Sequence, residues 1–208
     1  GRRSMAGGTV RITTSEVAAT WLLPPLIAQL QAQEPGIAIE LVASNQLTNL
    51  LRREADIAVR MVRPAQASLV ARQLGDIPIV AAAHRDYLAR HGTPRRPEDL
   101  AGHRLIGFDR DDGILKGFAQ MRMPLTREHF ALRTDAQIAY GQLVAAGAGI
   151  GFIAQYNLRQ WPGVVALLPQ LAIPPLPCWL AVHREIRASR LVRRVYDYLA
   201  EAIPPALA

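Results

Sequence analysis

Residues Val10–Leu30 read V-R-I-T-T-S-E-V-A-A-T-W-L-L-P-P-L-I-A-Q-L, and the order of patterns within them indicates the fold class. The first residues alternate apolar and polar side chains, as a short strand does. Thr13, Thr14 and Ser15 then supply three hydroxyls in a row, and apolar residues recur after them at helical spacing. Strand, hydroxyl-rich turn and helix form the first half of a βαβ unit.

In open α/β sheets, small ligands bind at the carboxyl ends of the strands, beside helix N-termini whose free N–H groups attract anions. Thr14 and Ser15 are therefore candidates for the floor of such a groove. The alternative is that these hydroxyls cap the helix and bind no ligand. Taken alone, Val10–Leu30 favours the cap.

The same design repeats along the next thirty residues. An alternating strand over 37–43 ends at Ser44 and Asn45, which are good N-caps for a helix over 47–51. Residues 55–60 form a third strand that is nearly all apolar, so we expect it to be covered on both faces. Two βαβ units in series predict a parallel sheet with right-handed crossovers.

The rest of the chain continues as an α/β series without a fixed repeat. Further strands are predicted at 69–83, 105–108, 130–133, 150–153 and 179–182. Helices are predicted from Ile138 to Val144 and from Ser189 to Ile203, whereas residues 110–129 and 161–177 are predicted to be loops. Thr134 and Asp135 stand at a third strand-to-helix corner, like Ser15 and Ser44.

Composition restricts the class of protein. The chain has 208 residues, half of them apolar, and no apolar run long enough to cross a bilayer. The net charge is +7, but most arginines are scattered. Arg187, Arg190 and Arg194 share a predicted helical face, for which a solvated surface is favoured over a contact with an acidic partner or DNA phosphate. The one cysteine, Cys178, fits a reducing compartment.

Signals for an enzyme are absent from the sequence. Neither G-x-S-x-G nor a Walker loop occurs, and the five histidines lack the spacing of metal ligands. The run G-A-G-I-G follows a helix and precedes a strand, which is the wrong order for a dinucleotide fingerprint. Cys178 is expected to be buried and inert. We expect no catalytic residue, no metal and no cofactor.

An ordered set of segments resembles the effector-binding (regulatory) domain of LysR-type transcriptional regulators. The matching segments run from about Gly8 to Ile203, nearly the whole chain. They are G-T-V-R-I-T-T-S with W-L-L-P-P-L-I, E-P-G, A-D-I-A-V-R-M-V-R-P, A-H-R-D-Y-L-A-R-H-G-T-P-R-R-P-E-D-L-A-G-H-R-L-I, R-T-D, L-V-A-A-G-A-G-I-G-F-I-A and V-H-R with S-R-L-V-R-R-V-Y-D-Y-L.

This resemblance implies an α/β fold of two Rossmann-like lobes joined by crossover strands, the type 2 periplasmic-binding-protein fold. The first lobe would comprise roughly residues 8–67 and 175–208, and the second roughly residues 68–174. The family's N-terminal winged helix-turn-helix is not in this chain, so DNA recognition is expected to belong to that missing segment.

In the family, the effector lies between the lobes, held by the turn after the first strand, the helix start after the second and facing loops of the other lobe. Carried onto this chain, these positions are Thr14, Ser15, Ser44, Asn45, Arg60, Phe108, Asp109, Thr134, Asp135, Phe152 and Ile153. Two carboxylates facing one groove would disfavour an anionic effector unless Arg60 or another arginine offsets them.

The expected function is that of a cytoplasmic, ligand-sensing regulator and not an enzyme. The expected partners are a small-molecule effector, either a small organic acid or another polar metabolite, a second copy of the chain in a homodimer or tetramer, and DNA through the missing domain. The family pairs these domains through the first helix. A periplasmic solute-binding protein of a transporter, which has the same fold, is the alternative.

Overall fold

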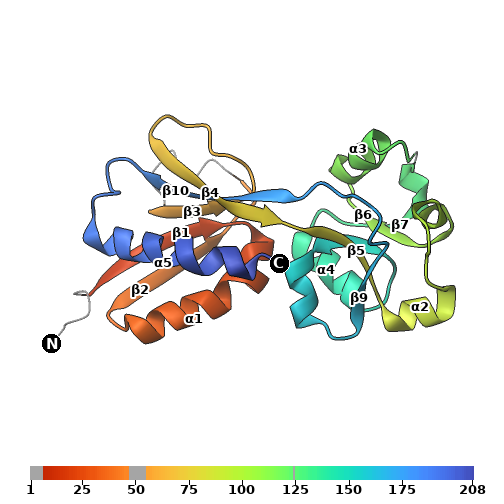
Figure 1. The fold of residues 1–208 in the computed structure, drawn as a ribbon, viewed down its shortest axis with the longest axis horizontal. Coiled ribbons are helices and arrows are strands. Elements are labelled where there is room, and N and C mark those ends of the chain that lie inside the picture. The colour runs from red at the N-terminus through yellow and green to blue at the C-terminus, as the bar shows by residue number, and fades with distance from the viewer. Residues whose placement is uncertain (1–6, 47–54, 124) are drawn as a thin grey trace. The chain divides into compact units, whose positions relative to one another are not determined.

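The computed structural model describes residues 7–46, 55–123 and 125–208, which form two compact units (Figure 1). Unit 1 comprises Gly1–Ile77 and Leu176–Ala208, and unit 2 comprises Pro78–Pro175. The chain therefore passes between the units twice. Unit 1 extends past the predicted lobe boundary at residue 67, because the strand that follows this position is paired within the sheet of unit 1 as far as Ile77.

Unit 1 is built on a five-stranded sheet with the order β2-β1-β3-β10-β4. β1 (Gly8–Thr14) pairs in parallel with β2 (Ile37–Ala43) and with β3 (Ile57–Arg60). β10 (Leu176–His183) is antiparallel to β3 on one side and to β4 (Leu69–Ile77) on the other. The predicted parallel arrangement of the first three strands is confirmed, and so is the burial of all four residues of β3.

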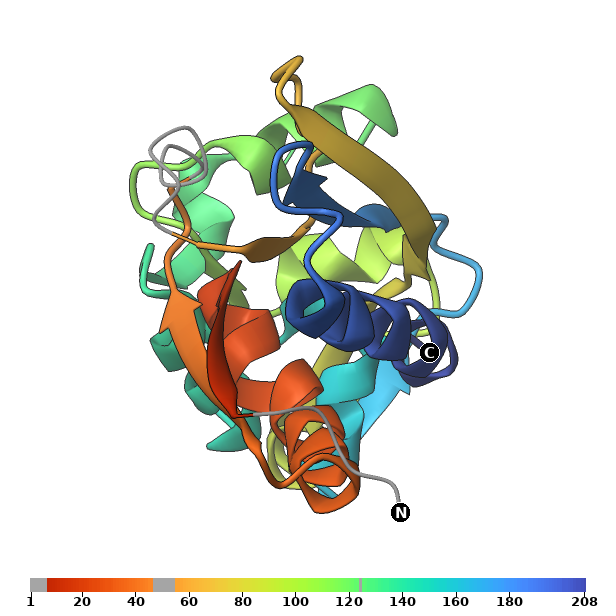
Figure 2. The same ribbon diagram turned by 90° about the vertical axis from the view of Figure 1, so that its left-hand side faces the viewer.

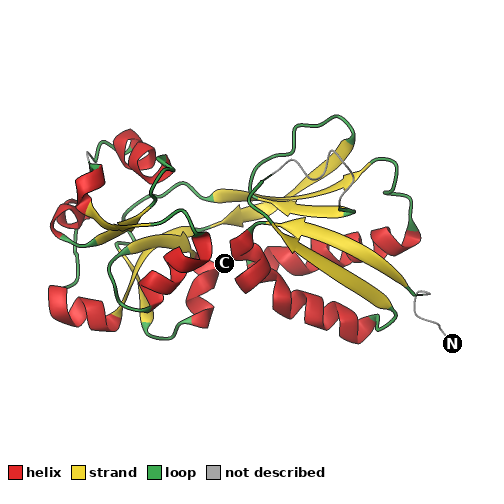
Figure 3. Cartoon of the chain, turned by 180° about the vertical axis from the view of Figure 1, so that it is seen from behind, coloured by secondary structure: helices red, strands yellow, loops and turns green. Residues whose placement is uncertain are grey.

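Two helices lie on the same face of this sheet, as Figures 2 and 3 show. A turn of π-helix over Ala18–Leu22 leads into α1 (Leu23–Gln33), which packs against α5 (Arg190–Ala206). The predicted C-terminal helix is confirmed, and it begins where Ser189 Oγ accepts the N–H of Val192 at 3.3 Å.

The arginines near α5 do not form the shared helical face that the sequence suggested. Arg187 lies in the turn before the helix, so its position relative to Arg190 and Arg194 is not set by the helical period. Arg194 Nε forms an ion pair with Glu34 at 3.0 Å, which ties α5 to the end of α1.

One predicted strand is in fact two. The apolar run over 69–83 is divided into β4 and β5 (Ile79–His84), which lie in different sheets of different units. Pro78 stands between them, and proline has no N–H to donate to a strand ladder. The helix predicted over 47–51 lies outside the described residues.

Unit 2 contains an antiparallel sheet of order β8-β5-β9, with β8 (Gly151–Ala154) and β9 (Val164–Leu167) on either side of β5. A parallel pair, β6 (Leu105–Gly107) and β7 (Phe130–Arg133), lies beside it. Ile150 joins the two sheets, because it accepts the N–H of Ile106 at 2.8 Å and donates to the carbonyl of Arg104 at 2.9 Å.

The helices of unit 2 are α2 (Arg85–His91), α3 (Gly113–Gln120) and α4 (Gln137–Ala145). Short 3₁₀ turns occur over Pro97–Gly102, Arg127–His129 and Gln155–Gln160. The predicted helix around 138–144 is confirmed as α4.

Two loop predictions are wrong. The segment 110–129 contains α3, and the segment 161–177 contains β9. Gly113 and Gly117 gave α3 a poor helical signature, but its buried Phe118 and the neighbouring Ile114 and Leu115 pack into the core of unit 2. Tertiary packing therefore stabilises a helix that propensity disfavours.

Candidate functional site

The carboxyl ends of β1, β2 and β3 meet at one edge of the unit 1 sheet, because these strands are parallel neighbours. The backbone N–H of Ser44 donates to the carbonyl of Thr14 at 2.9 Å, which holds the ends of β1 and β2 together. Five predicted site residues lie at this edge. We call them the polar corner, namely Thr14, Ser15, Ser44, Asn45 and Arg60.

Three side chains of the polar corner accept backbone hydrogen bonds. Ser15 Oγ accepts the N–H of Ala18 at 3.3 Å, and Ser44 Oγ accepts the N–H two residues further on at 3.1 Å. Asn45 Oδ1 accepts the N–H of Glu16 at 3.2 Å, so it crosses from the end of β2 to the start of the helical segment after β1. Ser15 and Ser44 therefore do act as caps. The bond from the Glu16 N–H to Asn45 also joins the first two strand-to-helix corners into one polar surface.

Ser15 and Asn45 retain hydrogen-bonding groups that a ligand could use. The hydroxyl of Ser15 donates to Met61 Sδ at 3.9 Å, and a thioether is a weak acceptor. The amide nitrogen of the exposed Asn45 makes no hydrogen bond to the described residues. Met61 follows β3 directly, and the sequence gave no reason to select it.

Thr14 differs from the other hydroxyl residues of the polar corner. It is the last residue of β1 and fully buried, and its Oγ1 donates to the carbonyl of Val59 at 2.9 Å. The hydroxyl of Thr14 is therefore engaged inside the sheet, where it connects β1 to β3.

Arg60 brings a positive charge into the polar corner. Its side chain is only 3% exposed, and the guanidinium donates to the carbonyl of Ser44 and to Thr13 Oγ1, the latter at 2.7 Å. Within the described part of the chain, no carboxylate forms an ion pair with it. Burial lowers the pKa of Arg60, because the charged form loses hydration. Thr13 is a site residue that sequence reasoning did not select, although it belongs to the hydroxyl run.

The two carboxylates predicted for the site lie in unit 2, and both are engaged. Asp135 accepts the backbone N–H groups of Asp109 at 2.9 Å, Arg110 at 3.0 Å and Asp111 at 3.3 Å. These bonds, led by that from Arg110, lower the pKa of Asp135 because they favour its charged form. Asp109 forms an ion pair with Arg127 at 2.9 Å. Asp135 is thus a turn cap, and the charge of Asp109 is offset by Arg127, which the sequence did not identify.

The remaining predicted residues of unit 2 contribute to a turn and to the core. Thr134 Oγ1 accepts the N–H two residues on at 3.1 Å, as a cap does. Phe108 packs against the ring of Tyr140 with centroids 5.2 Å apart, in the cluster that also buries Ile153. Phe152 packs instead against the other cluster of unit 2. Neighbouring strand residues point to opposite faces, so Phe152 and Ile153 do not line one surface.

Tyr140 connects three elements of unit 2, and sequence reasoning missed it. Its hydroxyl donates to the carbonyl of Ile106 in β6 at 2.8 Å and accepts the N–H of Phe152 in β8 at 2.9 Å. Burial raises the pKa of Tyr140. Both partners are distant in sequence, so no local pattern could have revealed this role.

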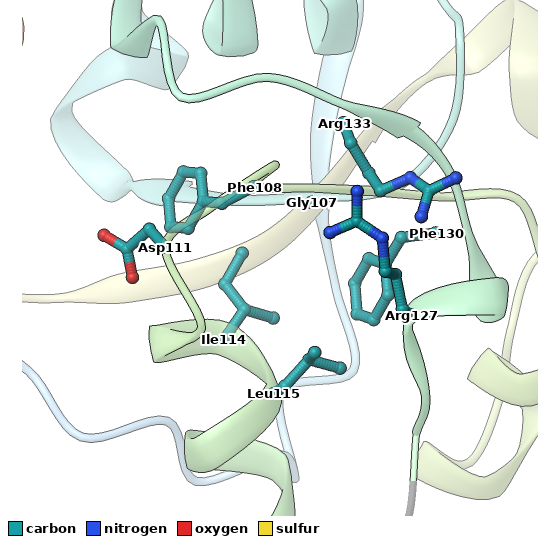
Figure 4. Close-up of a pocket in the computed structure, with 8 residues that line it drawn as sticks. All are labelled: Gly107, Phe108, Asp111, Ile114, Leu115, Arg127, Phe130 and Arg133. Atoms are coloured by element: carbon teal, nitrogen blue, oxygen red, sulfur yellow. The ribbon is translucent and has the colours of Figure 1, made fainter.

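A small cavity lies beside these residues in unit 2 (Figure 4). Its wall combines the cationic Arg127 and Arg133 with the apolar side chains of Phe108, Ile114 and Leu115. Its volume is about 10 Å³, roughly what one water molecule needs. The cavity is therefore too small to hold an effector.

Metal and thiol chemistry find no support in the described residues. No group of histidine, cysteine, aspartate and glutamate side chains there has the geometry of a metal site. Cys178 is buried as predicted, and burial raises the pKa of its thiol to about 12, which disfavours the reactive thiolate. No helix within this part of the chain has the length and apolar character that crossing a membrane requires.

Comparisons with known proteins give a consistent result. A family model described as "LysR substrate binding domain" matches residues 3–204. The HTH-type transcriptional regulator CrgA of Neisseria meningitidis is 38% identical over 205 residues, which are 94% of this chain and 67% of CrgA. The chain thus spans about two thirds of the length of this relative.

Solved structures show the same fold. The regulatory domain of CrgA superposes with a TM-score of 0.83 at 25% identity, covering 95% of this chain and 99% of that domain. The regulatory domain of CcmR from Synechocystis, solved in complex with 2-PG, has a TM-score of 0.75 at 19% identity. It covers 94% of this chain and 97% of that domain, and at this identity the likeness concerns the fold alone.

Proposed function

Because this chain belongs to the LysR family of transcriptional regulators, as their substrate-binding (regulatory) domain, we propose that its polar corner binds a small-molecule effector. The family confirms the resemblance drawn from the sequence, and it makes the chain part of a regulator and not an enzyme. LysR regulators bind small effectors and DNA. The observation that carries the proposal is the joining of the first two strand-to-helix corners by the bond from the Glu16 N–H to Asn45.

The proposed contacts come from side-chain groups that can form a further or stronger hydrogen bond. The Ser15 hydroxyl can exchange its weak bond to Met61 Sδ for one to an effector oxygen. The exposed amide of Asn45 can donate. Ser44 precedes Asn45 and donates its backbone N–H to the carbonyl of Thr14. Thr14 supports the site through its backbone carbonyl and its bond to Val59. The contacts expected from the second lobe, through Phe108, Asp109, Thr134, Asp135, Phe152 and Ile153, stay predictions.

The mechanism that suits such a domain is a population shift. An effector biases two existing conformations by its differential affinity for them, and tethered DNA-binding domains respond. The coupling between effector and DNA sites is typically about 1–3 kcal/mol. The binding of 2-PG to the CcmR domain, which has the same fold, supports a small-molecule effector here as well.

The partners of the whole protein follow from its family. We propose that it binds DNA through a helix-turn-helix domain outside this chain, acts in the cytoplasm where that DNA is, and assembles as a homodimer or tetramer. CrgA is a transcriptional regulator, so it lends no support to the alternative of a transporter's solute-binding protein.

The test is a thermal-shift screen of this chain against small organic acids, amino acids and aromatic compounds. We expect at least one compound to raise the melting temperature, and Ser15→Ala or Ser44→Ala to weaken its binding about tenfold through the loss of one hydrogen bond. Ser68→Ala, at an exposed position away from the polar corner, is the matched control. The proposal fails if no compound binds and both variants regulate normally in the full-length protein.

A further inference from the structure

Two buried N–H donors without partners belong to neighbouring strands of unit 1. Among the described residues, four buried side-chain atoms lack a hydrogen-bond partner. Two of them, on Glu34 and Asn157, are oxygen atoms, and the other two are Nε of Arg60 and Nε1 of Trp179. Both of these nitrogens carry a proton and can only donate.

The sheet register places the two residues that carry these donors opposite each other. Arg60 in β3 and Trp179 in β10 are direct partners in the antiparallel ladder. Directly opposed residues point to the same face, with Cβ atoms about 5 Å apart. Among the described residues, these are the only two buried side-chain N–H donors without a partner, and they belong to one cross-strand pair.

A buried N–H without an acceptor is unfavourable, and structures rarely leave one unexplained. The charge of Arg60 adds to this cost, since no described carboxylate pairs with it. Its other two nitrogens already donate, to the Ser44 carbonyl and to Thr13 Oγ1. An acceptor that also carries negative charge would satisfy the Nε–H of Arg60 and offset its charge.

A second cation lies against the same pair. The guanidinium carbon of Arg63 is 5.3 Å from the centroid of the Trp179 ring, so the indole is covered on one face by an arginine. Arg63 is exposed. Its charge favours an anion on approach.

We propose that the effector is an anion whose carboxylate accepts the Nε–H of Arg60 and the Nε1–H of Trp179. The inference rests on the proposed function, because it places the charged group of the effector next to the polar corner through Arg60. Trp179 then becomes a recognition residue, although no strand-to-helix corner contains it. Since Arg60 also holds the carbonyl of Ser44, an anion on Arg60 acts directly on the geometry of the corner.

The first experiment uses acetate, with acetamide as its uncharged isostere, and follows the three tryptophan indole N–H signals by NMR. Variants that replace each tryptophan by phenylalanine assign the signals. We expect acetate to move the Trp179 signal downfield with saturation, while those of Trp21 and Trp161 stay in place and acetamide moves none. The inference is overturned if acetate up to about 0.1 M leaves the Trp179 signal unmoved, since a ligand of this size is expected to bind with a millimolar Kd. It is equally overturned if acetamide acts like acetate.

A pair of variants separates recognition from folding. Trp179→Phe keeps an aromatic ring for Arg63 but loses the donor, and we expect the acetate Kd, read at the Arg60 backbone amide, to rise about tenfold. Trp161→Phe in unit 2 is the matched control and should bind as the wild type does. Melting curves must show that both variants fold. A folded Trp179→Phe protein with an unchanged Kd contradicts the assigned contact.

The outcome distinguishes this inference from the proposed function. If screening finds an uncharged effector that depends on Ser15 and Ser44, the proposed function stands and the anion site is wrong. If acetate binds Trp179 and Arg60 but no screened compound changes regulation, the anion site stands and its regulatory role is wrong.

Discussion

Tyr140 shows how one hydroxyl can connect elements that are far apart in sequence. It satisfies the Ile106 carbonyl and the Phe152 N–H at once, from a position that is 3% exposed. Removing the hydroxyl therefore takes a hydrogen bond from each of these two backbone groups.

We expect Tyr140→Phe to lower the free energy of unfolding by about 2 kcal/mol, because each orphaned group costs roughly 1 kcal/mol or more. Urea denaturation followed by circular dichroism measures the change. Tyr196→Phe, which removes a half-buried hydroxyl with no hydrogen bond to the described residues, should change the value by less than about 0.5 kcal/mol. Equal effects of the two substitutions would refute the role of Tyr140.

His103 makes unit 2 sensitive to pH. Its Nδ1 lies 2.7 Å from the Tyr87 hydroxyl, which accepts the backbone N–H of Arg104 at 3.0 Å, so the tyrosine proton is directed to an unprotonated Nδ1. Burial lowers the pKa of His103 below its usual value of 6.5, His91 lowers it further, and Asp99 opposes them. The folded state therefore binds this proton less readily than the unfolded state.

Because the folded pKa is the lower one, the contribution of His103 to stability is complete above about pH 6.5 and decreases as the pH falls towards the folded pKa. We expect the melting temperature to drop between pH 7.5 and 5.5, and to drop less in His103→Asn, which keeps an acceptor but does not titrate. An NMR titration of His103 with a midpoint at or above 6.5 would exclude this explanation.

At the scale of elements, close contact between β8 and α4 depends on a missing side chain. A Cβ added to Gly151 would lie 2.5 Å from Cγ2 of Val144 and 3.1 Å from Cε1 of Tyr140. Strand and helix can approach this closely only because residue 151 is glycine. Gly117 in α3 is the opposite case, because an added Cβ there meets nothing within 4 Å.

We expect Gly151→Ala to destabilise the protein by about 1–3 kcal/mol through overpacking. Gly117→Ala should stabilise it by about 0.5–1 kcal/mol, because alanine is the better helix former. Thermal denaturation of both variants under the same conditions gives the two signs. A stabilising Gly151→Ala would show that α4 can move away from β8 at little cost.

The elements also show what the sequence could predict. The parallel core of unit 1 follows from hydrophobic alternation and from the caps at Ser15 and Ser44, which are local signals. Pro78 divides an apolar run that looks continuous, and α3 carries two glycines, so local patterns gave the wrong reading at both places.

Some residues of the candidate site could likewise be predicted from local sequence signals, and others could not. The cap residues of the polar corner could be selected from their positions after strands. The pairing of Arg60 with Trp179 could not, because a register between residues more than a hundred positions apart is fixed by the assembled sheet. The same holds for Arg127, whose partner Asp109 is reached across a loop and a helix.

At the scale of the whole molecule, unit 2 is inserted at the tip of a hairpin in unit 1. Ile77 at the end of β4 and Leu176 at the start of β10 are direct antiparallel partners. The two ends of unit 2 therefore begin from neighbouring positions, and each unit has its own buried core residues.

We expect unit 1 to fold when residues 78–175 are replaced by Asn-Gly, because a two-residue turn suits an antiparallel hairpin. The fragment 78–175 should also fold alone. Cooperative unfolding measured by circular dichroism tests both chains. Val195→Asp, which places a charge in the buried face of α5, is the control that should prevent folding of the shortened unit 1. A shortened chain without a cooperative transition would mean that unit 1 depends on unit 2.

The position of β10 has a consequence for synthesis on the ribosome. This strand lies between β3 and β4 in the finished sheet, yet it leaves the ribosome only after all of unit 2. Until then β3 and β4 have no partner between them, and their exposed edges are open to other chains. Unit 2 can therefore fold before synthesis ends. Unit 1, which carries the polar corner, can complete its sheet only after β10 has been made.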